Sequence, residues 1–309
     1  MKTTNVSILA LFAVLIFNGC DYKNHDKRVE VQLKALTAKL TELETTDALD
    51  TFIQYYDSQA ISMPEYQVSL RGRKKIENFY REIFSRQQVI AFQRTSQEFI
   101  HMGSAIVEIG SFKKEYKDLK TDTLVGLTGK YWLVWDGSLD EGFKIKGESF
   151  GFFHPVPQPA LFTVGENQRQ PDEGELLGRR EIPFELKAYN ALMEKGVRNR
   201  DGNLRSEFFT PDGRFYPYAD TAIVGLTRIK SHLIEYSSRG HVSIDSIMCY
   251  TFDFSYFENY VLEYDMFKVK WSVPNFSGRT EGKGIRIWKR LPDGSLRLYR
   301  EIGTHNHLL

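Results

Sequence analysis

The feature that most constrains the fold of this chain is an internal repeat. When residues 50–154 are shifted by 153 positions onto residues 203–307, fifteen of the 105 aligned pairs are identical without a gap. Roughly six identities would arise by chance in a window of this length, so we predict a tandem duplication with one domain in each copy. The identical pairs include residue types that seldom coincide: Pro64 with Pro217, Gly72 with Gly225, Ile76 with Ile229, Gly129 with Gly282, Trp135 with Trp288, Glu148 with Glu301, and His154 with His307.

The first nineteen residues are predicted to be a signal peptide. A weakly positive start is followed at residues 7–17 by an apolar run, SILALFAVLIF, which is too short to span a bilayer. The run ends in Phe17-Asn18-Gly19-Cys20, which resembles the lipobox of bacterial lipoproteins. The resemblance implies cleavage before Cys20 and acylation of that residue, and the alternative is an ordinary cleaved signal with a stray cysteine. Residues 20–28 would then be a polar tether, and the protein would be held at the bacterial cell envelope by its lipid.

Composition excludes several partners. A net charge of +1 gives no field that would attract nucleic acid, and a hydrophobic content of 41% is that of an ordinary globular protein. Cys249 lies in an apolar run and is predicted to be a buried small hydrophobe. Without a CxxC motif or a His/Cys cluster, we expect no metal and no cofactor.

Both copies show the same order of predicted elements, helices followed by four strands. Such an order predicts an α+β fold in which one curved antiparallel sheet packs its concave face against N-terminal helices, forming a cone with a pocket at its open end. We expect domains at residues 29–154 and 182–309, joined by a proline-rich linker at 155–181. The first copy is predicted to have helices at 29–43, 48–56 and 71–87, a hairpin or irregular pair at 58–70, and strands at 88–101, 104–118, 123–136 and 142–154. The second is predicted to have helices at 182–197 and 226–238, a turn at Asp212-Gly213 leading into 214–224, and strands at 241–254, 257–272, 280–291 and 295–307.

Several segments resemble the NTF2-like superfamily, in particular its SnoaL-like branch. These are Tyr55-Tyr56-Asp57 with residues 68–73, their counterparts at 208–213 and 223–229, and a closing segment, residues 282–290 with 293–298 and His305-Asn306-His307. The resemblance implies a cone-shaped pocket and an internal pseudo-dimer of the two domains. Members of the family include isomerases, dehydratases, cyclases and epoxide hydrolases acting on small hydrophobic substrates, and modules that only bind ligands or dimerise. The family shares no single set of catalytic residues.

The last strand carries the first group of candidate site residues. His305 and His307 lie on one face, and Glu301 and Tyr299 share that face if no bulge intervenes. This group could relay protons, hold a metal, or only hydrogen-bond the end of an exposed strand. The first copy has Phe152 in place of His305, so we favour the second domain as the working site.

A second group of candidates could line the pocket of domain 2. The hydroxyls of Tyr216 and Tyr218, near Asp220, could polarise a carbonyl or only shield the core. Asp253, with Tyr250 nearby, lies in an apolar strand and is either a pocket base or on the solvent face. Trp288, like Trp135, could stack on a ligand or fill the core.

We therefore expect an envelope lipoprotein that binds a small, largely apolar molecule or acts as an interaction module. The alternative is an isomerase, lyase or hydrolase of the SnoaL type, with Asp253 or the His305/His307 pair as acid and base and with Tyr216 or Tyr250 as hydrogen-bond donor. A third hypothesis is a purely structural scaffold, which should fill both cones with aromatic side chains.

Overall fold

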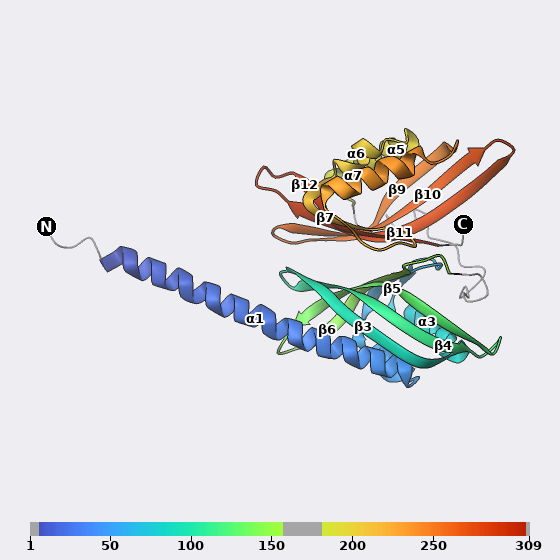
Figure 1. The fold of residues 1–309 in the computed structure, drawn as a ribbon. Helices are drawn as coiled ribbons and strands as arrows, with labels where there is room; N and C mark the ends of the chain where they lie inside the picture. Colours follow the sequence, from blue (N-terminus) through green and yellow to red (C-terminus); the bar gives the residue numbers. More distant parts are fainter. Residues whose placement is uncertain (1–5, 157–180, 307–309) are drawn as a thin grey trace.

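The protein is described by a computed structural model covering residues 6–156 and 181–306, with side chains from residue 25 onward. The described part forms two α+β domains (Figure 1). Domain 1 contains helices α1 (Val6–Thr45), α2 (Leu49–Phe52) and α3 (Arg73–Arg86), the 3-10 turn η1 (Ile53–Tyr55), and strands β1 (Tyr56–Pro64), β2 (Leu70–Arg71), β3 (Gln87–Met102), β4 (Ala105–Asp118), β5 (Thr123–Ser138) and β6 (Gly142–Phe152). Domain 2 contains helices α5 (Phe184–Arg198), α6 (Gly202–Ser206) and α7 (Leu226–Ser238), and strands β7 (Phe209–Tyr216), β8 (Ile223–Val224), β9 (Ser243–Tyr256), β10 (Tyr260–Val273), β11 (Phe276–Arg290) and β12 (Leu296–His305).

The two sheets have the same topology. Each is six-stranded, in the order β2-β1-β6-β5-β4-β3 in domain 1 and β8-β7-β12-β11-β10-β9 in domain 2. The predicted antiparallel sheet is present as the four-stranded meander of each domain. The sequence did not predict that β1 pairs in parallel with β6, or that β7 pairs in parallel with β12. These pairs are parallel because the chain crosses from the first strand through a helix to the far edge of the sheet. The four-stranded meander then brings the last strand back beside the first. The predicted turn at Asp212-Gly213 lies within strand β7.

The matched glycines of the repeat begin the same helix in both domains. Gly72 precedes α3 with φ +88°, and Gly225 precedes α7 with φ +86°, a conformation that side chains with a Cβ rarely adopt. The N–H of Gly72 donates to the carbonyl of Ala60 at 2.8 Å, and that of Gly225 donates to the carbonyl of Gly213 at the same distance. The turn from the first strand into this helix is therefore built identically in the two copies.

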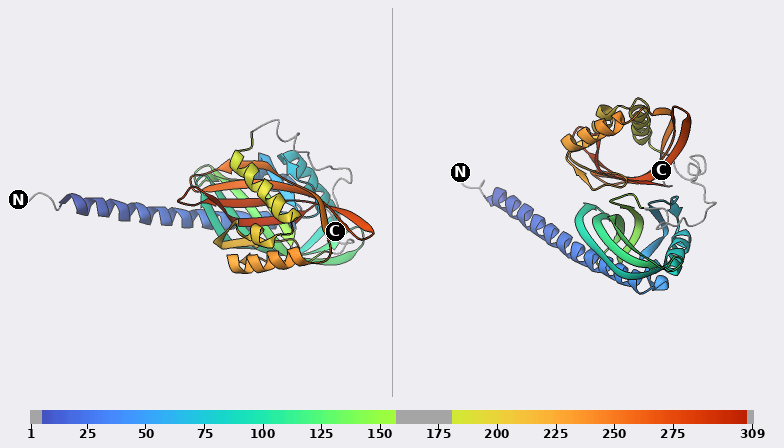
Figure 2. Two further views of the ribbon diagram at one scale, coloured as in Figure 1. Left: turned by 90° about the horizontal axis from the view of Figure 1, so that it is seen from above. Right: turned by 45° about the vertical axis from the view of Figure 1, so that its right-hand side comes forward.

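Helices lie on the outer faces of the molecule, and the two sheets face each other across its middle (Figures 1 and 2). Each sheet curves around its own helices, as the right-hand view of Figure 2 shows. The inward-facing sheet surfaces form a shared apolar layer that includes Trp132, Val134, Tyr216, Ile285 and Ile287. A separate core lies inside each cone, between the sheet and its helices.

Two buried lysines cross between the sheets. Lys130 and Lys283 are a matched pair of the repeat, and their side chains are almost fully buried. The ammonium of Lys130 donates to the backbone carbonyls of Pro217 and Asp220 in domain 2. The ammonium of Lys283 donates to the carbonyl of Gln67 in domain 1 at 2.5 Å. The two lysine contacts have approximate twofold symmetry, as in the self-complementary interface of a symmetric dimer.

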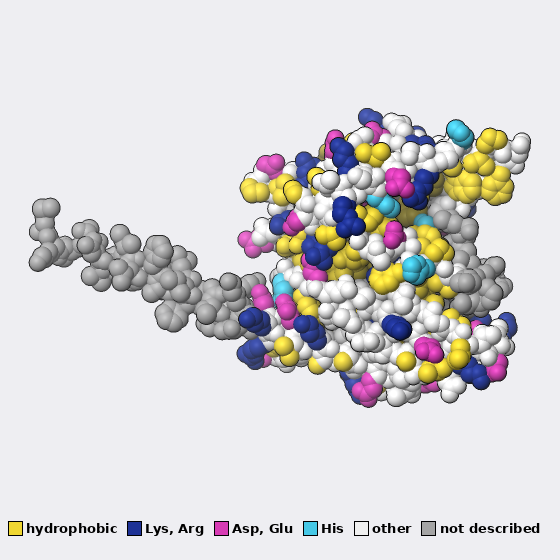
Figure 3. Space-filling view, in the orientation of Figure 1, with side chains coloured by type: hydrophobic (Ala, Val, Ile, Leu, Met, Phe, Trp, Pro, Cys, Tyr) yellow, Lys and Arg dark blue, Asp and Glu magenta, His cyan; other side chains and the backbone are white. Residues whose placement is uncertain are grey.

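The N-terminal part of helix α1 projects beyond domain 1 (Figure 1). Helix α1 includes residues 20–28, so the segment predicted as a tether is helical. Within the described residues, no helix has a stretch long and apolar enough to cross a membrane. Most of the predicted linker at 155–181 lies outside the described residues. Acidic and basic side chains are intermixed over the face of both domains shown in Figure 3.

Candidate functional site in the first domain

Domain 1 contains a partly open cavity of about 100 Å³ between its sheet and its helices. This volume is of the same order as the roughly 150 Å³ apolar cavity that can hold a benzene molecule. The lining is mainly aromatic and aliphatic, with a small number of charged groups, as in many small-molecule sites. The lining includes Glu44, Phe79, Tyr80, Phe92, Arg94, Phe112, Lys114, Tyr116, Leu127, Leu133 and Glu148.

The cavity has an acidic group held by hydroxyls. The carboxylate of Glu148 accepts hydrogen bonds from the hydroxyls of Tyr56 at 2.7 Å, Ser62 at 2.5 Å and Tyr80 at 3.0 Å. Glu148 is only 3% exposed. Burial raises the pKa of the Glu148 carboxyl, which the hydroxyl groups lower only in part. The pKa values of Tyr56 and Tyr80 are also raised, first by burial and then by the nearby carboxylate. Burial therefore favours the neutral forms of these three groups at the wall of the cavity.

Three elements position these side chains. Ser62 of β1 and Glu148 of β6 are directly paired neighbours in the parallel ladder, so their side chains project on the same face. Tyr80 lies on the buried face of α3, one position after Phe79. Tyr56 is the first residue of β1, directly after the 3-10 turn. The parallel pairing of the first and last strands, which the sequence did not predict, is therefore what assembles the group.

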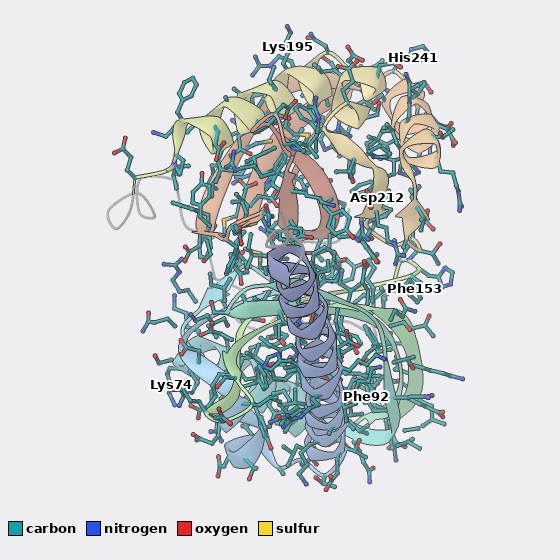
Figure 4. The ribbon with its side chains drawn as sticks, turned by 90° about the vertical axis from the view of Figure 1, so that its left-hand side faces the viewer. Lys74, Phe92, Phe153, Lys195, Asp212 and His241 are labelled. Carbon is teal, nitrogen blue, oxygen red and sulfur yellow. The ribbon has the colours of Figure 1, made fainter. Side chains whose placement is uncertain are left out.

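A second polar group at the cavity consists of two cations and one carboxylate. Arg94 of β3 forms an ion pair with Glu44 at the end of α1, and the ammonium of Lys114 on β4 lies 3.8 Å from the other carboxylate oxygen. Figure 4 labels Phe92, which is paired with Lys114 across strands β3 and β4. The ammonium lies 5.2 Å from the centre of the Phe92 ring. Burial lowers the pKa of Lys114, and Glu44 raises it only in part.

A third buried carboxylate, Glu108, is structural. It accepts hydrogen bonds from Thr37 at 2.8 Å, Ser96 at 2.6 Å, Tyr131 at 2.8 Å and Trp135 at 2.9 Å. These donors come from α1 and from strands β3 and β5, so the carboxylate joins the helix to the sheet. A carboxylate whose oxygens are each held by two donors has little capacity left for a ligand.

Domain 2 repeats this structural carboxylate. Glu263 accepts from the indole of Trp288 at 2.8 Å and from Thr251 at 2.6 Å. Glu108 pairs across the strands with Leu133, and Glu263 pairs in the same way with Arg286. Leu133 and Arg286 are matched by the 153-residue shift of the repeat. The equivalent glutamates are therefore 155 residues apart. The ungapped comparison missed them, and a two-residue gap between the matched strands would have aligned them.

The interior of domain 2 contains a buried arginine. The guanidinium of Arg286 lies 2.9 Å from Glu301, 3.0 Å from Asp265 and 3.7 Å from Glu263. Burial raises the pKa of Asp265 to about 7, with Arg286 opposing the shift. In domain 1 the place of Arg286 is taken by Leu133, which lines the cavity. The cavity is thus in domain 1, whereas the sequence analysis favoured domain 2.

Most of the predicted ligand-binding residues lie between the domains. Tyr216 packs edge-on against Trp132 of domain 1 at 5.5 Å, and Tyr250 belongs to the same layer between the sheets. The ring of Tyr218 lies 4.3 Å from that of His305, and the Tyr218 hydroxyl is 2.9 Å from the hydroxyl of Tyr66 in domain 1. Burial lowers the pKa of His305 to about 4, and the Lys283 charge adds to the shift.

The remaining predicted residues do not meet in one site. Asp253 forms an ion pair with Arg71 of domain 1. A register shift in β12 puts Tyr299 out of phase with Glu301 and His305. Tyr299 therefore does not share a strand face with these two residues. Trp288 is in the core of domain 2. His154 is exposed, Cys249 is buried, His307 lies outside the described residues, and the side chain of Cys20 is likewise outside them.

Comparison with known proteins gives similarity of fold. No family model matches the sequence, and no curated protein matches it significantly. Similar solved structures include NTF2-like and ketosteroid isomerase-like proteins. A ketosteroid isomerase-like protein from Erwinia carotovora atroseptica is 10% identical over 39% of this chain and 93% of its own, with a TM-score of 0.35. An NTF2-like superfamily protein from Salmonella enterica is 11% identical over 38% and 89%, with a TM-score of 0.33. One from Cytophaga hutchinsonii is 15% identical over 37% and 90%, with a TM-score of 0.31. Each covers about the share of one domain.

Proposed function

We propose that domain 1 binds a small, largely apolar molecule inside its cone, and that domain 2 is a filled, structural copy. The observation that supports this most is the contrast between Leu133 beside a cavity and Arg286 within an ion-pair network at the same place of the repeat. A scaffold would fill both cones, so the retained cavity favours a ligand. An apolar ligand would contact the aromatic lining and hydrogen-bond the Glu148 group.

Binding can be tested with 4-fluorobenzamide, a neutral aromatic probe followed by ¹⁹F NMR. Leu127→Trp should block binding, because Leu127 lines the cavity. The matched control is Leu124→Trp on the same strand, where the side chain is 67% exposed, and this variant should bind as the wild type does. Absence of binding to the wild type, or binding that Leu127→Trp leaves unchanged, would contradict the proposal.

A second candidate function is catalysis of proton transfer next to a carbonyl, by an isomerase or lyase. The specific observation in its favour is a buried carboxyl with a raised pKa, hydrogen-bonded to two tyrosines at a cavity wall. Glu148 would exchange the proton, and Tyr80, which also lines the cavity, would stabilise the enolate oxygen.

This activity can be measured without knowledge of the natural substrate. Acetophenone in D₂O should exchange its methyl protons faster with the wild-type protein than with Glu148→Gln, as measured by ¹H NMR. Equal exchange with both proteins would exclude this activity at Glu148 and leave binding as the function.

We also propose that Cys20 is lipidated and holds the protein at the bacterial cell envelope. The support is the Gly19-Cys20 pair that follows the apolar run at residues 7–17. Cells expressing the full chain should incorporate labelled palmitate into the wild type and lose the label in Cys20→Ser. Equal labelling of the two proteins would contradict acylation at this residue.

A further inference from the structure

The polar group formed by Arg94, Lys114 and Glu44 at the cavity contains two cations and one carboxylate. Arg94 and Lys114 share the carboxylate of Glu44, and Arg94 makes the closer contact. Asp47, at the exposed end of α1, also acts on Lys114. Glu148 also lines the cavity, and burial raises the pKa of its carboxyl, which disfavours a negative charge there.

Glu65, which also lines the cavity, faces other cations. Its carboxylate accepts from the backbone N–H of His305 at 2.5 Å, and the charges of Lys283 and Lys130 act on it. Its negative charge is therefore balanced at the domain interface. Among the lining residues of the aromatic part of the cavity, Arg94 and Lys114 therefore share one buried counter-charge, Glu44.

The fold itself does not require these cations. Phe112 pairs with Arg94 and Gly129 in domain 1, and Phe267 pairs with Cys249 and Gly282 in domain 2. Because Gly129 and Gly282 are matched in the repeat, Cys249 occupies the place of Arg94. Lys114 lies two residues after Phe112 on β4, and Val269 lies two residues after Phe267 on β10, so Val269 occupies the place of Lys114. The second copy thus builds the same sheet with apolar residues at both positions.

Burial of an ammonium without a full counter-charge is costly. The Lys114 side chain is 10% exposed, and its neighbours include the rings of Phe92 at 5.2 Å and Tyr116 at 5.9 Å. A charged group that the fold does not need, and that is buried at a cavity wall, is best explained by a ligand of opposite charge.

We propose that the cavity is selective for a small aromatic anion, such as a carboxylate, whose negative group binds the Lys114 ammonium while its ring lies among the aromatic side chains. This inference rests on the proposed binding function and specifies its ligand class. Arg94, held by Glu44, adds to the positive potential but stays paired. Since a bound anion would favour the charged form of Lys114, binding of the anion should weaken as pH rises and that ammonium loses its proton.

The test compares three probes of similar size and different charge by ¹⁹F NMR: 4-fluorobenzoate, 4-fluorobenzamide and 4-fluorobenzylamine. For the wild type we expect the benzoate to bind about tenfold more tightly than the benzamide, and the benzylamine most weakly. In Lys114→Met the benzoate should lose this advantage while the benzamide keeps its affinity. Lys114→Arg should restore much of the preference. Lys113→Met, at the adjacent exposed residue, should leave all three affinities unchanged.

The outcomes separate this inference from the proposed function. Equal binding of benzoate and benzamide, or a benzoate preference that survives in Lys114→Met, would overturn the anion selectivity and leave the binding function intact. Failure of all three probes to bind would overturn both. Thermal unfolding of each variant shows whether lost binding reflects lost folding.

Discussion

Leu133 and Arg286 occupy the same place in the two sheets, and they give the two cones different interiors. Leu133 is paired with Glu108 and lines the cavity of domain 1, whereas Arg286 is paired with Glu263 and contacts three carboxylates in domain 2. At this place of the repeat, domain 1 thus has an apolar cavity wall and domain 2 has a buried ion network.

Arg286→Leu should destabilise domain 2 strongly, although leucine is the residue found at this place in domain 1. Loss of the guanidinium leaves Asp265 and Glu301 buried without their cation, which costs on the order of 3–5 kcal/mol. Urea unfolding at pH 7 measures the effect. Arg239→Leu, which removes an exposed helix ion pair with Glu235, is the control and should leave the urea unfolding midpoint nearly unchanged. An Arg286→Leu protein as stable as the wild type would show that the network is dispensable.

Glu148→Gln should change how stability depends on pH. Because the folded-state pKa of Glu148 is raised, its contribution to stability is fully present below the unfolded-state pKa of about 4.5 and is lost as pH rises through the folded-state value. The variant cannot ionise at this position, so its free energy of unfolding should decline less than that of the wild type as pH rises. The measurement is urea unfolding at a series of pH values from 4 to 9. Parallel curves for the two proteins would mean that Glu148 ionises in the fold as it does in the unfolded chain.

His305→Phe should reduce the loss of stability in acid. The pKa of His305 is lowered to about 4, so its contribution is present above the unfolded-state pKa of about 6.5 and is lost as pH falls toward 4. Protonation of His305 in acid would lower the free energy of unfolding by up to about 3 kcal/mol. Phenylalanine is the residue at the matched position 152 and fits the contacts with Tyr218 and Phe267. Unfolding midpoints between pH 4 and 7 should diverge for the two proteins, and midpoints that fall in parallel would contradict the assignment.

Gly72→Ala and Gly225→Ala should each lower stability through the backbone alone. A Cβ at Gly72 would be 3.6 Å from its nearest neighbour and one at Gly225 would be 3.9 Å away, so neither clashes. The positive φ of both residues lies in a region that costs other residues about 1–3 kcal/mol. Gly126→Ala, where a Cβ meets no atom within 4 Å, should cost less. Thermal unfolding of the three variants compares them directly, and equal losses would show that φ is not the cause.

Much of the fold could be predicted from the sequence because it follows local periodicity. Helices α3, α5 and α7 and the four-stranded meander of each domain were expected within a few residues of where they lie, since the alternation of apolar residues marks a strand wherever its partner is. Helix α1 begins at Val6, well before the predicted start at residue 29, and α6 was not predicted. The position of β1 beside β6 depends on a contact between distant segments, and no local pattern records it.

The site was harder to predict because each sheet is buried on both faces. Alternation shows that Tyr216, Tyr250 and Trp288 point toward buried surfaces, but it does not distinguish the inside of a cone from the layer between the sheets. The structure puts Tyr216 and Tyr250 in that layer and Trp288 in a cone. Glu148 was already visible as the partner of Glu301 in the repeat. Its three hydroxyl donors come from segments that the sequence could not place together.

The most direct test of the account is a crystal structure of the protein soaked with 4-bromobenzamide, in which anomalous scattering locates the bromine. We predict a bromine peak inside domain 1, among Tyr80, Phe92 and Leu127, and no peak beside Arg286 in domain 2. A peak in the interior of domain 2, or one beside Tyr218 and His305 between the domains, would contradict the assignment of domain 1 as the binding domain.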